Sequence, residues 1–333
     1  MESNNYKLDS VAVISMGSIG RRHVRIVRRV LPECRIFAVR SGRGVSCNEE
    51  TLLSGLYSSV EEVIEGQVDA AIICAPASMH VEYALPFLEK NIPLLIEKPV
   101  ADTTENAFPL LSAADGKIAY VGYVLRHHPA YKVIRDIIDN NELGAVRMAS
   151  ITVKTYLPNW RPEIDYRLSV SAQRNLGGGV LRELSHELDY AQSLLGNFAE
   201  VVGYRNEKSV LDIEVEEQVI GILTTEDKVH VQLSFDFASS IEEREFRIHF
   251  AEGEVIWNLL KQTLIVKRLD RELNNMDFSI GRDELFVRQF KTFIGAINGE
   301  TTLAATIKES VMVLSVIEGL EKSFEKKKIV SII

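Results

Sequence analysis

The sequence is poor in cysteine, in positive charge and in long apolar runs, and each shortage excludes a class of protein. Its three cysteines, Cys34, Cys47 and Cys74, lack the spacing of metal ligands and cannot all pair, so we expect no metal site and a reduced, cytoplasmic protein. The formal net charge of −9 argues against a general nucleic-acid binder. No apolar run approaches the ~20 residues of a membrane span, and the first ten residues contain no signal-peptide core, so no membrane contact is expected.

What is present is an ordinary globular composition, 46% hydrophobic and 26% charged, over 333 residues, enough for two domains. From residue 10 to about residue 119, short apolar segments alternate with amphipathic ones. This alternation is typical of a doubly wound parallel sheet. The expected strands are 11–14, 35–39, 69–74, 92–96 and 118–123, and the expected helices are 20–30, 58–65, 80–90 and 103–114.

After Pro129 the pattern changes to strands with alternating polarity, which favours an antiparallel sheet. The expected strands are 146–156, 200–204, 215–223, 229–237, 245–250, 254–260 and 263–269, with helices at 129–140, 181–195, 283–297 and 306–324. We therefore predict an α/β protein with a Rossmann domain in residues 1–125. An α/β domain with a large, mostly antiparallel open sheet follows in residues 126–333, and its last helices are free to pack back on the first domain.

A glycine turn joins the first strand to the first helix. The dinucleotide fingerprint asks for three glycines there; Gly17 and Gly20 supply the second and third, and Ser15 replaces the first. Backbone N–H groups of the turn, including those of Ser18 and Ile19, are suited to bind phosphate at the helix N-terminus. The alternative is an ordinary turn in an α/β protein without a nucleotide.

The end of the second strand decides which nicotinamide cofactor is expected. An acidic residue there would bind the ribose 2′-hydroxyl of NAD, but the chain has Arg40, Ser41 and Arg43. Two guanidinium groups and a hydroxyl suit a 2′-phosphate, because arginine pairs with phosphate through charge-assisted hydrogen bonds. We expect NADP to be preferred to NAD, and a solvated basic loop is the alternative.

The tripeptide Glu97-Lys98-Pro99 closes the apolar run 92–96. Ligands of open α/β sheets bind beyond the carboxyl ends of the strands, so Lys98 is placed where cofactor and substrate meet. There it is expected to hydrogen-bond a substrate hydroxyl and to shuttle its proton. A surface lysine at a strand end is the other interpretation.

Five groups of residues together resemble the glucose-fructose oxidoreductase / inositol dehydrogenase / MocA-like (Gfo/Idh/MocA) oxidoreductase family over nearly the whole chain. They are Gly17-x-x-Gly20-x-x-His23, Pro76-x-x-x-His80, Glu97-Lys98-Pro99, Gly122-Tyr123-x-x-Arg126, and Gly177-Gly178-Gly179 followed by His186-x-x-Asp189. The resemblance implies NAD(P)-dependent redox chemistry at a carbon of a sugar, polyol or sugar nucleotide, in a homodimer or homotetramer. It also implies a set of ligand contacts: cofactor contacts from Ala75, Pro76, His80, Glu97 and Lys98, and substrate contacts from Lys98, Tyr123, Arg126 and His186.

The resemblance further implies that Lys98 and His186 handle the proton of the substrate hydroxyl. Neutral imidazole accepts a proton near pH 7, as alcohol oxidation requires. The family has an aspartate four residues before this histidine, where the chain has Arg182; Ser15 and Ala77 are two further departures. Glu183, three residues before His186, is the expected substitute, because positions three apart share a helical face. A histidine that only packs locally is the alternative.

The segment 156–174 carries arginines interleaved with aromatic residues, namely Trp160, Arg161, Tyr166, Arg167 and Arg174. Arginine binds carboxylate or phosphate, and aromatic faces stack on sugars and bases. We expect this loop to contact an anionic or nucleotide-linked carbohydrate, and local ion pairs with Glu163 and Asp165 are the alternative. Two other functions remain open for the chain: an NAD-dependent glycoside hydrolase that retains its cofactor, and a non-catalytic NAD(P)-binding regulator.

Overall fold

The computed structural model describes residues 8–40, 42, 46–269 and 271–332, and the chain forms two compact units. The first comprises residues 1–127 and 281–311, and the second comprises residues 128–280 and 312–333. The boundary therefore lies two residues beyond position 125, and a late segment returns to the first unit.

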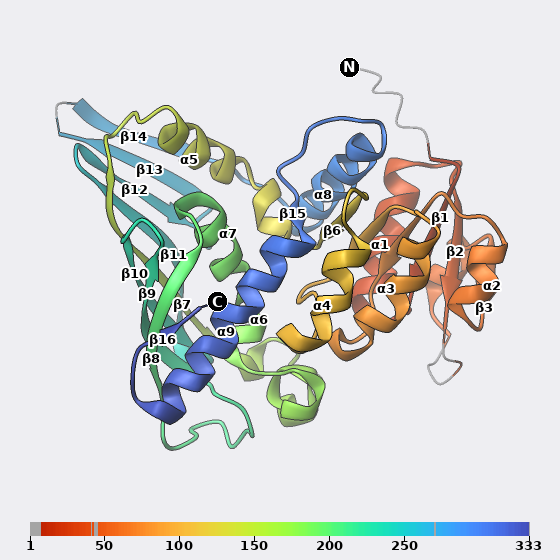
Figure 1. The fold of residues 1–333 in the computed structure, drawn as a ribbon, viewed down its shortest axis with the longest axis horizontal. Coiled ribbons are helices and arrows are strands. Elements are labelled where there is room, and N and C mark those ends of the chain that lie inside the picture. Colours follow the sequence, from red (N-terminus) through yellow and green to blue (C-terminus); the bar gives the residue numbers. More distant parts are fainter. Residues whose placement is uncertain (1–7, 41, 43–45, 270, 333) are drawn as a thin grey trace. The chain divides into compact units, whose positions relative to one another are not determined.

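The first unit is built on a sheet with strand order β15-β6-β5-β4-β1-β2-β3 (Figure 1). All neighbours are parallel except β15, which pairs antiparallel with β6. The strands are β1 (Ser10–Ile14), β2 (Arg35–Val39), β3 (Gly55–Tyr57), β4 (Ala70–Ile73), β5 (Leu94–Ile96), β6 (Ala119–Val121) and β15 (Ala305–Thr306). This is the predicted doubly wound sheet, with β3 and β15 added.

The helices of this unit are α1 (Ser18–Val30), α2 (Val60–Glu65), α3 (His80–Glu89), α4 (Thr104–Ala113) and α8 (Arg282–Ile297). Every residue of β1 is buried, as expected for a strand covered on both faces. Phe286 and Phe290 of α8 belong to the same apolar core as β1 and α1. The late helix α8 is therefore part of the nucleotide-type domain, although residues 128–280 of the second unit precede it in the chain.

The second unit contains a sheet with strand order β14-β13-β12-β11-β7-β10-β9-β8-β16. Its pairs are antiparallel except β7 with β10, so the prediction of a mostly antiparallel sheet is confirmed. The strands are β7 (Val146–Tyr156), β8 (Phe198–Arg205), β9 (Gln218–Thr225), β10 (His230–Asp236), β11 (Ala238–Phe250), β12 (Gly253–Asn258), β13 (Thr263–Arg268), β14 (Arg271–Asp277) and β16 (Val330–Ser331).

Helices cover one face of this sheet: α5 (Pro129–Asp139), α6 (Val180–Glu183), α7 (Ser185–Leu195) and the second-unit part of α9 (Ile307–Lys326) (Figure 1). A Cβ atom on Gly203 of β8 would lie 2.9 Å from Leu320 of α9, so glycine permits the close approach there. The opposite face carries exposed apolar side chains, among them Tyr204 and Ile220, which are 58% and 60% exposed.

The helix predicted for residues 181–195 is in fact two helices. Leu184, with φ −94° and ψ 24°, separates α6 from α7. Glu183 and His186 therefore lie on different helices, and the argument that three-residue spacing brings them to one face does not apply.

Candidate active site

The glycine turn is shaped by a serine in a left-handed conformation. Ser15 has φ 78°, a region that costs a non-glycine residue about 1–2 kcal/mol, so it takes the backbone shape that the missing first glycine would supply. Gly20 is required by packing, because a Cβ atom there would lie 2.0 Å from the carbonyl oxygen of Ser15.

Gly17 is different, because a Cβ atom there would meet no protein atom within 4 Å. The residue caps α1, Ser18 beside it is exposed, and the first turn of α1 contains no acidic residue. A helix N-terminus with free space over a glycine fits the pyrophosphate of a dinucleotide. The residues present therefore suit the cofactor that the sequence indicates.

The carboxyl ends of β1, β4 and β5 lie next to one another at one edge of the sheet. The glycine turn follows β1, the segment with Ala75 and exposed Pro76 follows β4, and Lys98 follows β5. Three of the predicted cofactor segments are thus brought together within the first unit.

The predicted 2′-phosphate site is described only at Arg40. Its guanidinium forms an ion pair with Glu50, at the 3₁₀ turn 48–52. Ser41 and Arg43 lie outside the described residues. Part of the positive charge that the sequence offers to a phosphate is therefore shared with a carboxylate.

Glu97 is buried and its carboxylate is occupied by protein groups. Oε1 lies 2.7 Å from Nε2 of His23, and Oε2 accepts the backbone N–H of Lys98 at 3.3 Å. A Cβ atom on Gly122 would lie 3.1 Å from the carboxylate, which is a tight contact, so glycine leaves the carboxylate more room. Glu97 therefore holds Lys98 in place, and the sequence offered no sign that His23 is its partner.

His80 is also buried, at 1% exposure, and both of its ring nitrogens face carbonyl oxygens. Nδ1 lies 2.9 Å from Pro99 O and Nε2 lies 2.7 Å from Ala75 O. Burial lowers the pKa of His80, although the two carbonyls and Glu97 act in the opposite direction. A neutral ring donates to only one of these carbonyls, but each of its nitrogens faces a protein oxygen, so His80 supports the segments around it.

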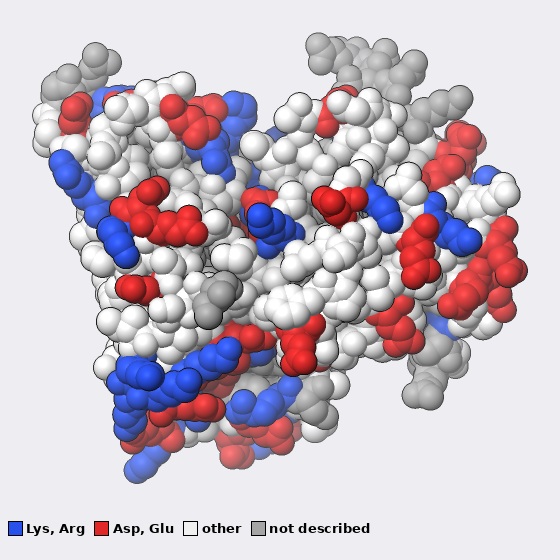
Figure 2. Space-filling view, in the orientation of Figure 1, with Lys and Arg blue, Asp and Glu red and all other residues white. Residues whose placement is uncertain are grey.

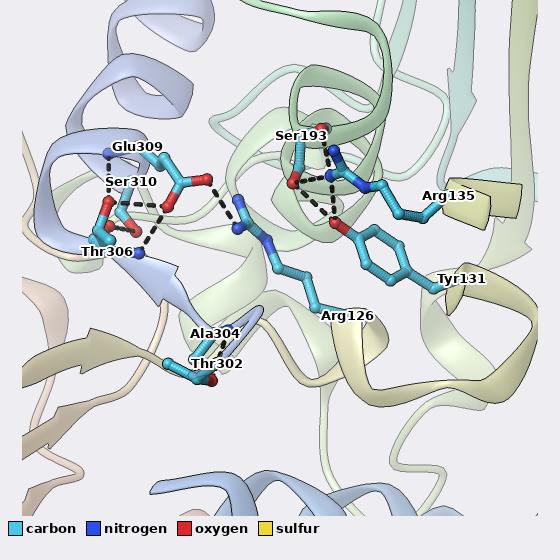
Figure 3. A network of polar contacts seen from close by, with 9 residues as sticks. All are labelled: Arg126, Tyr131, Arg135, Ser193, Thr302, Ala304, Thr306, Glu309 and Ser310. Atoms are coloured by element: carbon cyan, nitrogen blue, oxygen red, sulfur yellow. Dashed lines mark hydrogen bonds and ion pairs between the residues drawn. The ribbon is translucent and has the colours of Figure 1, made fainter. Parts of the chain in front are cut away.

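Arg126 and Tyr123, predicted to contact substrate, are only 5% and 1% exposed. Figure 3 shows the guanidinium of Arg126 directed to Glu309, at an N–O distance of 2.8 Å. Glu309 also accepts hydrogen bonds from the backbone and hydroxyl of Thr306, at 2.8 and 2.7 Å. The described contacts of Arg126 thus include an ion pair with a partly exposed carboxylate inside the first unit.

Two of the three glycines before His186 are explained by contacts within the second unit. A Cβ atom on Gly178 would lie 2.4 Å from Val170 O, and one on Gly179 would lie 2.3 Å from Oε1 of Glu216. Oε1 of Glu216 accepts the N–H of Leu181 in the first turn of α6, and burial raises the pKa of this carboxyl. Gly178 and Gly179 are therefore required by packing within the second unit, and Glu216 was not predicted.

The charged residues before His186 make contacts that the sequence did not indicate. Glu183 accepts a hydrogen bond from the hydroxyl of Ser171 at 2.8 Å. Arg182 forms an ion pair with Glu321 of α9, with one N–O distance of 3.2 Å. Arg182 therefore serves to join α6 to α9.

The residue after His186 fixes α7 on the sheet. Glu187 is fully buried and forms an ion pair with Arg244 of β11, with an N–O distance of 2.6 Å. Tyr190, one turn later, packs on Phe246 and Trp257, with ring centroids 4.9 and 5.2 Å apart. These contacts attach the face of α7 that carries Glu187 and Tyr190 to strands β11 and β12 of the sheet.

In the predicted substrate loop, several polar groups bind other parts of the second unit. Tyr166 donates to Leu211 O at 2.9 Å, and Arg174 donates to Glu214 O at 2.8 Å. Arg167 pairs with Asp165 at 2.9 Å, which favours the local ion pair considered above. Trp160, 40% exposed, donates to Thr155, while Arg161 is exposed.

On the face of the second unit that Figure 2 shows, basic and acidic side chains are mixed. Figure 2 shows Lys and Arg gathered near the end of α9, where 326–328 are exposed lysines, with acidic side chains beside them. Among the described residues, no cluster of His, Cys, Asp and Glu is placed to hold a metal. No described helix combines the length and the apolar composition that crossing a membrane requires.

Comparison with known proteins gives matches to both units. The profile described as "Oxidoreductase family, NAD-binding Rossmann fold" matches residues 10–123, and the "GFO/IDH/MocA C-terminal domain" matches residues 131–256. The chain is 26% identical to 1,5-anhydro-D-fructose reductase of Ensifer adhaerens over 287 residues, which cover 82% of this chain and 83% of that enzyme. It is 26% identical to inositol 2-dehydrogenase of Burkholderia lata over 194 residues, covering 56% and 54% of the two chains.

Among solved structures, levoglucosan dehydrogenase in complex with NADH and levoglucosan superposes with a TM-score of 0.87. The alignment covers 97% of this chain and 99% of that one, at 18% identity. This likeness shows that the two proteins share their fold.

Proposed function

Because the chain belongs to the Gfo/Idh/MocA oxidoreductase family, with an NAD-binding Rossmann fold, we propose that it transfers hydride between nicotinamide and a carbon of a carbohydrate. That carbon bears a hydroxyl or keto group in a sugar, a polyol or a sugar-nucleotide derivative. The observation that carries the proposal is the adjacency of three strand ends, which offer the open turn at Gly17 and an anchored Lys98.

Bound NAD(P) supplies the hydride acceptor or donor. Backbone N–H groups at Gly17, Ser18 and Ile19 bind its phosphates at the N-terminus of α1. Lys98, fixed through Glu97, donates a hydrogen bond to the reacting oxygen. His186 on the second unit takes or returns the hydroxyl proton. We propose Glu183, the carboxylate at the end of the preceding helix α6, as the residue that orients it, although the two residues do not share a helical face.

The expected substrates are neutral or anionic carbohydrates. Exposed Arg161 and half-exposed Trp160 are the described groups of the 156–174 segment that suit an anionic or nucleotide-linked one. The three cysteines are free thiols, which agrees with a reducing cytoplasm.

We propose further that NADP is preferred to NAD through Arg40, and that the chain forms a homodimer or homotetramer. The second proposal is supported by the uncovered sheet face, where Met148 and Ile222 join Tyr204 and Ile220 as exposed apolar residues.

The test is turnover of purified protein with each nicotinamide cofactor and a panel containing inositol, 1,5-anhydro-D-fructose and levoglucosan, followed by nicotinamide absorbance. Lys98→Met and His186→Ala should each lower kcat by roughly 10²–10⁴-fold. Cofactor affinity should stay near that of the wild type, because the turn at Gly17 is untouched. Glu183→Gln should lower kcat by a smaller factor than either of these two substitutions.

Two matched controls are Lys132→Met, at an exposed position of α5, and His230→Ala, at an exposed position of β10. Both should keep wild-type turnover. Full activity of His186→Ala on a substrate of the wild type would show that the proton-transfer residue lies elsewhere. A cofactor that stays bound without net turnover, together with glycoside cleavage, would favour the hydrolase.

A further inference from the structure

Two buried histidines hold the segment that carries Lys98, one on each side of it. His23 has no exposed surface, and its Nε2 lies 2.7 Å from the carboxylate of Glu97, the residue before the lysine. His80 is 1% exposed, and its Nδ1 lies 2.9 Å from the carbonyl of Pro99, the residue after it. Both contacts are made within the first unit.

Each histidine comes from an element that begins at a predicted cofactor turn. His23 lies on α1, three residues after Gly20. His80 is the first residue of α3, and its Nε2 lies 2.7 Å from the carbonyl of Ala75, in the turn after β4. The turns after β1 and β4 are therefore each linked by one imidazole to the end of β5.

The link through Glu97 has little freedom to move. One carboxylate oxygen faces His23, and the other accepts the backbone N–H of Lys98. Gly122 packs on the third side, so closely that a Cβ atom there would lie 3.1 Å from the carboxylate. The ring of Phe286 contacts the imidazole of His23 edge to face, with centroids 5.7 Å apart.

We propose that His23 and His80 are positioning residues for Lys98, and that they set the place of its backbone relative to the two cofactor turns. The role of Lys98 in the reaction rests on the proposed function. A displacement of about 1 Å in a reacting group costs about 100-fold in rate, so a support of this kind acts mainly on kcat.

The two nitrogens of His80 can be tested separately with amide side chains. The amide nitrogen of asparagine is placed like histidine Nδ1, and that of glutamine like Nε2. His80→Asn therefore keeps a donor for Pro99, whereas His80→Gln keeps one for Ala75. For His23, Gln is the conservative variant that keeps a donor for Glu97, and Phe keeps a ring without one.

Two measurements are made on each variant with cofactor bound. The first is turnover, with kcat and KM determined separately on a substrate of the wild type. The second needs no substrate: the pH dependence of trace acetylation of Lys98, read by mass spectrometry, with Lys132 on α5 as internal reference.

We expect His80→Gln and His23→Phe to lower kcat about 10–100-fold, with KM and the Kd for NADH within about threefold of the wild type. Acetylation of Lys98 should change severalfold, and that of Lys132 should not. His80→Asn and His23→Gln should recover most of the wild-type kcat. Wild-type kcat and wild-type Lys98 acetylation in His80→Gln would overturn the proposal for His80, and wild-type behaviour of His23→Phe would overturn it for His23.

If a variant fails to fold, Gly122→Ala provides a milder perturbation of the same carboxylate. Gly122→Ala should lower kcat, and it should shift Lys98 acetylation in the direction expected for His23→Phe. Unchanged values of both kcat and Lys98 acetylation would contradict the proposed support through Glu97. A wild type without turnover on any substrate would count against the proposed function, while the acetylation data would still decide whether the histidines position Lys98.

Discussion

His127 should make the protein sensitive to mild acid, independently of any substrate. Its imidazole lies in the first unit with Nδ1 3.3 Å from Oγ1 of Thr292. Burial, with the neighbouring guanidinium groups of Arg126 and Arg288, lowers the pKa of His127 from 6.5 to about 3. The folded protein therefore keeps this ring neutral, while the unfolded chain binds a proton below pH 6.5.

The sign follows from proton linkage. Between pH 6.5 and pH 3 the unfolded state holds more protons than the folded state, so the free energy of unfolding rises with pH. The contribution is fully present above pH 6.5 and is lost as the pH falls toward 3. At pH 5, about 1.5 units below the reference pKa, the loss is at most about 2 kcal/mol at about 1.36 kcal/mol per unit. Because part of the residue reaches the surface, we expect about 1–2 kcal/mol.

The assay is urea unfolding of the wild type and His127→Asn at pH 7 and pH 5. Asparagine keeps a polar group for Thr292 but does not titrate, so the difference between the two proteins isolates this histidine from the carboxyl groups. The variant should lose about 1–2 kcal/mol less than the wild type on going to pH 5. His230→Asn, on the exposed face of β10, controls for loss of a histidine. Parallel pH dependences of the wild type and His127→Asn would refute the argument.

Two further predictions concern the cofactor and the assembly. NADPH should bind more tightly than NADH in a fluorescence titration at fixed salt. Arg40→Asp should narrow or reverse this preference. Glu50→Gln should widen it by releasing the guanidinium of Arg40, and the ratio of the two Kd values should rise about tenfold for each 1.4 kcal/mol gained. Tighter NADH in the wild type would contradict the assignment of Arg40. Light scattering at micromolar concentration should give a particle mass that is a multiple of 37.4 kDa. The double variant Tyr204→Glu with Ile220→Glu should lower that mass toward the monomer. A monomeric wild type would exclude the proposed homodimer or homotetramer.

Much of the fold was predictable because its elements carry strong local patterns. The strand expected at residues 146–156 is β7, and the fully apolar segments of the first unit are buried parallel strands. The two-residue strand β15 and three-residue strand β3 were missed, because such short segments contain no period to detect. That α8 joins the first core could not be settled either, since an amphipathic pattern shows which face is buried but not what buries it.

The site was predictable where a local sequence pattern limits a residue to one structural position, as a glycine turn or a strand end does. The glycine turn and the strand-end lysine lie where they were expected, and Gly17 has open space above it. The partners of buried charges were not predictable. Arg126 pairs with Glu309, 183 residues away, and Glu97 with His23, 74 residues away, and no local pattern links such pairs.

The contacts of Arg182 limit what this residue implies for the chemistry. Its guanidinium is bound to Glu321, and it counteracts the burial that raises the pKa of Glu216 beneath Gly179. The exchange of an acidic for a basic residue at this position is thus compensated by carboxylates on α9 and before β9. His186, on the separate helix α7, is held instead by the contacts of its neighbour Glu187 with β11. Because different contacts fix the two helices, the altered charge at position 182 is no argument against proton transfer by His186.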